Sequence, residues 1–157
     1  MPLDADSRAM LKKANEQEGK HEWLEAAKSY EKLLSSKQVA SSLAAETWER
    51  IGFCYNWASR QTEDLDGFKK LRQLSVEAYK SAAKLFEKED SLKNQGKSAQ
   101  CKAIAEYVCS WLASNSSEKR KMLDECIEFG KKSLEAFEKA DDKLNYGKMC
   151  NDLLLSP

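Results

Sequence analysis

The segment Ala44–Trp57, with the sequence AAETWERIGFCYNW, is the most informative stretch of this 157-residue chain. Trp48, Ile51, Gly52 and Tyr55 follow one another at steps of three, one and three residues, which places them on one face of an α-helix. A glycine inside a helix costs about 1 kcal/mol relative to alanine. We therefore expect that Gly52 is kept because a neighbouring helix approaches closely there, where only a missing side chain leaves room.

The composition predicts an all-α protein of one domain. The only two prolines are Pro2 and Pro157, so no proline interrupts a helix between the ends of the chain. Charged residues make up 33% of the chain and cancel to a net charge of zero, which argues against a nucleic-acid-binding protein. The most apolar stretch, Ile104–Ala113, is interrupted by Glu106 and is too short to cross a membrane.

Cysteine usage indicates a reducing compartment. The five cysteines are odd in number, form no Cys-x-x-Cys pair and lie in apolar helical patterns, so we expect free thiols buried in the core: Cys54, Cys101, Cys109, Cys126 and Cys150. The segment Met1–Asp6 carries acids and no apolar run, so no signal peptide is predicted. Together these features predict a cytoplasmic protein.

Apolar spacing predicts about seven helices, over residues 6–18, 22–35, 42–60, 65–87, 91–113, 118–139 and 141–155. We expect a turn around His21, a long polar connection at 62–67 and a helix cap from Ser116 or Ser117. The pattern places Ile127 in the core. Trp111 is expected there too, with an exposed position as the alternative.

The second half of the chain repeats itself. A shift of 51 residues carries Val76–Lys88 onto Ile127–Lys139 and Gly96-Lys97 onto Gly147-Lys148. We therefore expect helix pairs with a period of about 50 residues. The predicted units are residues 6–36, 42–88 and 91–139, with a partial fourth unit at 141–155.

The motif Trp48-x-x-Ile51-Gly52-x-x-Tyr55 resembles the first helix of the tetratricopeptide repeat (TPR) family, which reads Trp-x-x-Leu-Gly-x-x-Tyr. Ile51 stands where the family has leucine. The resemblance implies a right-handed TPR-like solenoid of antiparallel helix pairs, here with elongated hairpins. It also implies a protein-interaction scaffold that binds a peptide or helical segment in a concave groove.

By this resemblance the groove draws on the first helices of the pairs. The implied residues are Glu46, Glu49, Phe53, Asn56 and Trp57, followed by Ala99, Lys102, Glu106 and Cys109. Members of the family that hold a C-terminal carboxylate use Lys and Asn at the positions of Glu49 and Phe53. An acid and an aromatic ring stand there in this chain, so we expect a neutral or basic partner segment with an apolar anchor. For Trp57, packing against the 62–67 connection is an equal alternative.

Two other functional classes are alternatives. The segment Ile104–Tyr107 resembles the SNAP adaptors of membrane fusion, which are elongated TPR-like solenoids and bind coiled-coil bundles. An enzyme is the third reading. His21 is the only histidine, no cysteine has a histidine near it in sequence, and no metal-ligand spacing or glycine-rich phosphate loop is present, so no catalytic, cofactor-binding or metal residue is predicted.

The last predicted helix is expected to pack one stripe that includes Leu144 onto the helix before it. Leu153, Leu154 and Leu155 would then leave apolar side chains without a covering helix. We accordingly predict either that this chain belongs to a longer solenoid or that it self-associates through residues 141–155.

Overall fold

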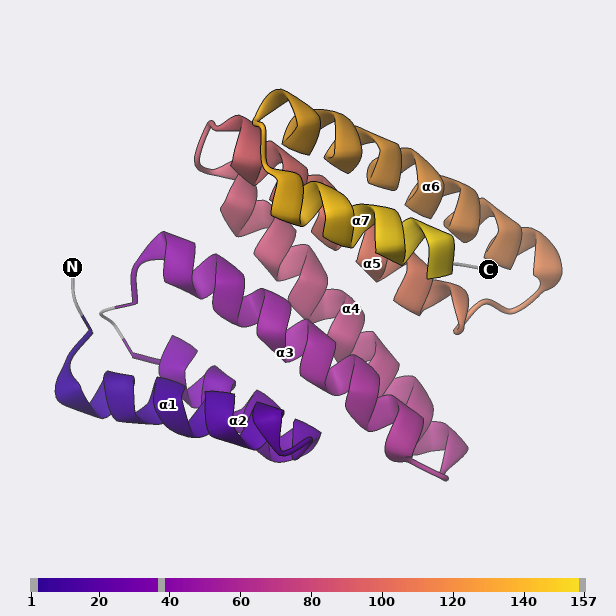
Figure 1. Cartoon of the computed structure of the whole chain (residues 1–157). Helices are drawn as coiled ribbons and strands as arrows, with labels where there is room; N and C mark the ends of the chain where they lie inside the picture. The colour runs from indigo at the N-terminus through magenta and orange to yellow at the C-terminus, as the bar shows by residue number, and fades with distance from the viewer. Residues whose placement is uncertain (1–2, 37–38, 156–157) are drawn as a thin grey trace. The chain divides into compact units, whose positions relative to one another are not determined.

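The computed structural model describes residues 3–36 and 39–155, with side chains through Asn151 in the last helix. These residues form seven α-helices and no strand, which confirms the all-α prediction (Figure 1). The helices are α1 (Ala5–Gly19), α2 (Trp23–Leu34), α3 (Ser41–Gln61), α4 (Leu65–Glu87), α5 (Leu92–Ser110), α6 (Ser116–Lys139) and α7 (Lys143–Leu155). Within the described part of the chain, no helix is long and apolar enough to span a bilayer.

Side-chain caps set several helix starts. Ser91 Oγ accepts a hydrogen bond from Asn94 N at 3.1 Å at the start of α5. Asn115 Oδ1 accepts from Glu118 N at 2.8 Å and caps α6. The expected cap at Ser116 or Ser117 is therefore wrong, because Asn115 takes that role and both serines lie inside the helix. Helix α4 begins at Leu65 and ends at Glu87, as predicted, so only residues 62–64 of the polar segment 62–67 connect it to α3.

Two helices end in the same turn, with a non-glycine residue in the left-handed region. His21 has φ 61° after α1, and Asp141 has φ 54° after α6. In each case the next amide closes a bond to the carbonyl five residues earlier, at 2.9 Å for both Glu22 N to Gln17 O and Asp142 N to Phe137 O. The turn predicted around His21 is thus present.

The chain divides into two compact units, Met1–Ala82 and Ala83–Pro157, and the boundary falls inside α4. The first unit has a core from α1 to α4 that includes Ala14, Trp23, Tyr30, Ile51, Cys54 and Ala78. Trp48 packs against this core, while Ile51, Gly52 and Tyr55 are buried. The motif face predicted from the sequence is therefore the packed face of α3.

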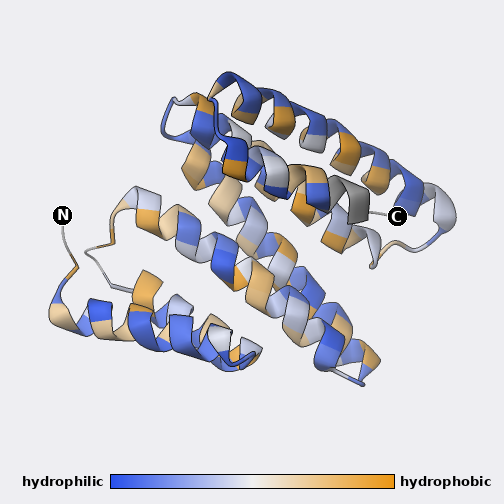
Figure 2. Ribbon diagram, in the orientation of Figure 1, coloured by the Kyte–Doolittle hydropathy of each residue, from blue (hydrophilic) through white to orange (hydrophobic). Residues whose placement is uncertain are grey.

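The second unit has its own core. Ala103, Cys126 and Met149 are buried together, one from each of α5, α6 and α7. Each helix shows apolar and polar residues alternating around its axis (Figure 2). Three placements predicted from periodicity are wrong, because exposed fractions are 43% for Ile127, 47% for Trp111 and 70% for Leu144. The predictions for Leu153, Leu154 and Leu155 concern side chains outside the described residues.

The close approach expected at Gly52 is present. A Cβ at Gly52 would lie 2.7 Å from the ring of Tyr79 in α4, inside the closest distance that packed atoms tolerate. Ser75, one turn before Tyr79, donates a hydrogen bond to the Gly52 carbonyl at 2.7 Å. The missing side chain thus lets α4 lie directly on the backbone of α3.

The same arrangement recurs between α5 and α6. A Cβ at Gly96 would lie 2.5 Å from the ring of Phe137, and Ser133 Oγ donates to the Gly96 carbonyl at 2.9 Å. The segment Ser75–Tyr79 (SVEAY) corresponds to Ser133–Phe137 (SLEAF), which is a shift of 58 residues. The predicted shift of 51 is wrong for these second helices, because it pairs buried Val76 with exposed Ile127.

Candidate interaction surface

Four aromatic side chains gather on the first unit, from the α1–α2 turn, α2 and α3. The His21 ring stacks on Trp23 at 4.9 Å between centroids with 11° between planes. Trp23 stacks in turn on Trp57 at 5.8 Å and 21°. Phe53 meets the edge of Trp23 at 5.7 Å and lies 6.2 Å from Trp57. We call His21, Trp23, Phe53 and Trp57 the aromatic surface.

Local structure explains why these rings meet. The left-handed turn at His21 brings its ring back over Trp23, which is the first residue of α2. Phe53 and Trp57 are four residues apart in α3 and therefore share one face of that helix. Packing of α2 on α3 then places Trp23 against both rings.

Two arginines lie over these rings. The Arg50 guanidinium lies 4.3 Å from the centroid of Phe53, and that of Arg60 lies 4.7 Å from the centroid of Trp57. Each distance is within the range of an attractive cation–π contact. The ring faces of α3 are thus already partly engaged by cations from the same helix.

Glu18 holds Arg50 in place. Arg50 Nε and Nη2 donate to the two carboxylate oxygens of Glu18 at 2.9 and 2.7 Å, a bidentate pair. The Tyr30 hydroxyl donates to Asn15 Oδ1 at 2.8 Å and lies 3.2 Å from Glu18 Oε1. One carboxylate at the end of α1 therefore connects α1, α2 and α3 beneath the aromatic surface.

Cys54 lies in the same polar network, with its Sγ 3.7 Å from Glu18 Oε1. Burial, followed by the negative charge of Glu18, raises the pKa of the Cys54 thiol to about 12. Burial also raises the pKa of Tyr30. Both groups are neutral at physiological pH, so Cys54 is a packed thiol rather than an activated nucleophile.

The exposure of the four rings decides what this surface offers a partner. Trp57 is 37% exposed, His21 is exposed and Phe53 is half-buried, whereas Trp23 is only 8% exposed. A buried tryptophan thus supports an exposed histidine and an exposed tryptophan from below. Rigid rings of this kind give contact area at little entropic cost, as hot spots of protein interfaces do.

The other predicted groove residues of α3 lie on the same side of that helix. Glu46 is exposed, and Glu49 and Asn56 are half-buried. Asn56 Oδ1 is buried without a hydrogen-bond partner among the described residues. Of the predicted set, Phe53 and Trp57 belong to the aromatic surface. The contact of Trp57 with Trp23 places its ring on the α2–α3 surface.

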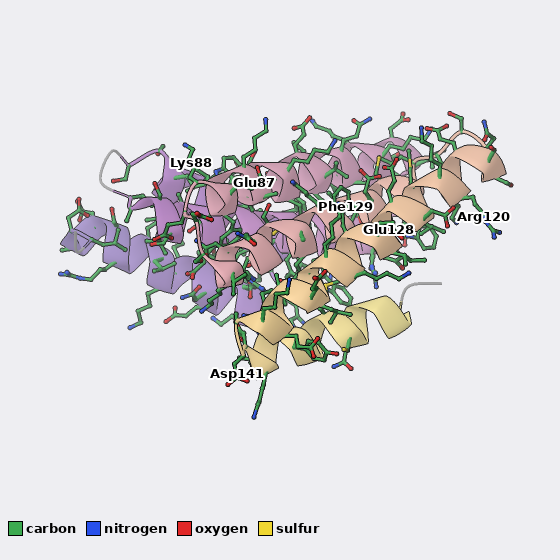
Figure 3. The ribbon with its side chains drawn as sticks, turned by 90° about the horizontal axis from the view of Figure 1, so that it is seen from above. Glu87, Lys88, Arg120, Glu128, Phe129 and Asp141 are labelled. Carbon is green, nitrogen blue, oxygen red and sulfur yellow. The ribbon has the colours of Figure 1, made fainter. Side chains whose placement is uncertain are left out.

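The predicted groove residues of α5 belong to the second unit. Lys102 forms an ion pair with Glu87 and lies 5.8 Å from the Phe129 ring centroid. The side-chain hydrogen bond from Lys102 is the largest cause of the lowered pKa of Glu87. Figure 3 shows Glu87 near the end of α4 and Phe129 along α6. Ala99, Glu106 and Cys109 are half-buried. A groove that joins these residues to the α3 face stays a prediction.

The periodicity of the sequence missed His21 and Trp23 as members of the aromatic surface, and Arg60 as the cation over Trp57. His21 and Trp23 lie two residues apart across a helix start, where a helical repeat gives no information. The composition of the short His-x-Trp segment, an aromatic pair beside a turn, was the only available signal.

No family model matches the sequence, and no curated protein or solved structure matches it either. Among the residues with described side chains, no three His, Cys, Asp or Glu side chains gather closely enough to hold a metal ion.

Proposed function

We propose that this chain is a protein-interaction module that binds a peptide or helical segment, built as a TPR-like solenoid of antiparallel helix pairs. The repeated Gly–aromatic packing of α3 on α4 and of α5 on α6 supports a repeat architecture. Such folds serve many partners, so the partner class must come from the surface chemistry. A cytoplasmic location stays part of this proposal.

The observation that carries the proposal is the aromatic surface. A soluble domain ordinarily buries rings of this size, and an exposed Trp57 supported by Trp23 gives a partner a preformed apolar contact. The partner segment should therefore carry an apolar or aromatic anchor that covers the exposed part of Trp57.

The charged side chains of α3 indicate which charge the partner segment should carry. The α3 face carries Glu46 and Glu49, and the positive charge of Arg50 is already matched by Glu18. These two carboxylates disfavour an acidic segment and favour a neutral or basic one, while the Arg60 guanidinium over Trp57 adds one positive charge beside the anchor. An acidic C-terminal peptide of the kind held by a carboxylate clamp should bind poorly.

Selection from a random peptide library on the intact chain tests this proposal. We expect the enriched peptides to carry an aromatic or aliphatic anchor with neutral or basic neighbours, and Trp57→Ala to weaken their binding at least tenfold. The matched control is Trp111→Ala, which removes the exposed tryptophan of the second unit. Circular dichroism checks that both variants stay helical.

Two results would contradict the proposal. One is the enrichment of acidic peptides. The other is binding that Trp57→Ala leaves unchanged while Trp111→Ala abolishes it, since the binding surface would then lie in the second unit.

A further inference from the structure

Gly147 in α7 occupies the position that Gly96 holds in α5. Each glycine lies five residues after the residue that caps its helix, Ser91 for α5 and Asp142 for α7. A lysine follows each glycine in the sequence. The two helices therefore present a glycine at the same height above the start of the helix.

The surroundings of the two glycines differ completely. A Cβ at Gly96 would lie 2.5 Å from the Phe137 ring, whereas a Cβ at Gly147 would meet nothing within 4 Å among the described residues. Gly147 and Lys148 are exposed. The backbone of α7 is therefore uncovered at Gly147, whereas a neighbouring helix covers Gly52 in α3 and Gly96 in α5.

The side of α7 around Gly147 is apolar as well as open. Leu144 is 70% exposed and Tyr146 is 37% exposed, while Met149 is 1% exposed and packs with Ala103 and Cys126. One side of α7 is therefore fixed to its own unit, where α7 packs on α6. The other side of α7 has no covering helix among the described residues.

The two covered glycines show what fits such a position. On Gly52 and on Gly96 the covering helix places an aromatic ring over the glycine, and a serine one turn earlier donates to the glycine carbonyl. The covering segments are Ser75–Tyr79 and Ser133–Phe137. The complementary helix therefore has the pattern Ser-x-x-x-Phe or Ser-x-x-x-Tyr.

Charge adds to this pattern. The described side chains of α7 include Lys143 and Lys148, both exposed, and no carboxylate. A helix with acidic residues beside its aromatic residue would meet the lysines of α7 with complementary charge.

We propose that the exposed side of α7, formed by Leu144, Gly147 and Lys148, binds a helix of a partner protein that carries Ser-x-x-x-Phe or Ser-x-x-x-Tyr with acidic neighbours. The aromatic ring lies over Gly147 and the serine hydroxyl donates to its carbonyl. Leu144, three residues before Gly147 and beside it on the helix surface, supplies the apolar edge of this site. The site is separate from the aromatic surface, so the two proposals stand or fall independently.

The test uses the full chain and a fluorescent peptide with the sequence of residues 116–139, in which Cys126 is replaced by serine. Fluorescence anisotropy should show saturable binding. Gly147→Leu should weaken this binding at least tenfold, because the new side chain fills the space that the Phe137 ring of the peptide needs. The peptide with Phe137→Ala should lose at least tenfold as well.

The matched control is Gly19→Leu, which adds the same side chain at another glycine with nothing within 4 Å. It should leave peptide binding unchanged, as should Trp57→Ala. The peptide could instead bind by displacing α4 from Gly52 or α6 from Gly96. Gly147→Leu leaves both of these glycines unchanged, so binding of that kind would persist in this variant. Circular dichroism and thermal melting confirm that the variant is folded.

Three outcomes would overturn the proposal. The first is no saturable binding of the peptide. The second is binding that Gly147→Leu or the Phe137→Ala peptide leaves unchanged. The third is self-association in sedimentation equilibrium that Gly147→Leu abolishes, which would make a second copy of the chain the occupant of α7.

Discussion

Glu18 shows how one side chain can organise a surface that it does not itself form. Its two oxygens bind Arg50, and the hydroxyl of Tyr30 and the thiol of Cys54 lie beside it. Arg50 is thereby held over Phe53. Charged hydrogen bonds of this kind contribute about 1.5–3 kcal/mol when partly shielded from water.

The buried Cys54 thiol predicts a loss of stability in alkaline solution. Its pKa rises from 9.0 in the unfolded chain to about 12 in the fold, so both states hold the proton below pH 9. Above pH 9 the unfolded chain loses this proton first, and the free energy of unfolding falls as the pH rises toward 12. Tyr30, whose pKa is also raised, acts in the same direction.

Urea denaturation from pH 8 to pH 11 measures this effect. The wild-type chain should lose stability more steeply above about pH 9 than Cys54→Ala, which lacks the thiol. Parallel pH profiles for the two proteins would show that Cys54 does not carry the effect.

The helix pairs pack closely at Gly52 and Gly96, whereas Gly147 is open. Alanine should therefore lower the free energy of unfolding at the first two positions and raise it at the third. Gly52→Ala and Gly96→Ala place a Cβ 2.7 and 2.5 Å from an aromatic ring. Overpacking of this kind should lower the free energy of unfolding by about 1–3 kcal/mol. Gly147→Ala meets nothing within 4 Å among the described residues, so the gain in helix propensity should raise stability by up to about 1 kcal/mol.

Guanidinium denaturation of the three variants checks this prediction. Because the substitution is the same at each site, differences among the variants report the surroundings rather than the residue type. A loss of stability at all three positions would mean that Gly147 is covered in solution. Equal stability of wild type, Gly52→Ala and Gly96→Ala would refute the close packing of the hairpins.

The distribution of the cysteines over the chain predicts a pattern of thiol reactivity. Cys54 and Cys101 are 0% exposed and Cys126 is 3% exposed, whereas Cys109 and Cys150 are half-buried. The expectation of free thiols agrees with the structure, and that of full burial holds for three of the five. We expect Cys109 and Cys150 to react first with iodoacetamide and the other three to react slowly until the chain unfolds.

Mass spectrometry of the alkylated protein, with and without denaturant, identifies the modified positions. All five thiols should react in denaturant. Rapid native labelling of Cys54 or Cys101 would contradict the full burial of these two thiols.

The sequence by itself determined the helical content, the number of helices and most of their bounds. This succeeds because the 3.6-residue apolar period is a local property of the chain. The one cap predicted from the sequence, at Ser116 or Ser117, was wrong by one or two residues because Asn115 takes that role. It also determined that Gly52 needs a neighbour, since an interior glycine is costly without one. It did not determine that Tyr79 is this neighbour, because the pairing joins residues far apart in the chain.

Only the tertiary structure decided which apolar faces are covered. Trp111, Ile127 and Leu144 satisfy the helical pattern and yet remain exposed. Periodicity shows which side chains share a face of a helix, but it does not show whether another helix covers that face. The aromatic surface has the same origin, since Trp23 meets Trp57 only when α2 packs on α3.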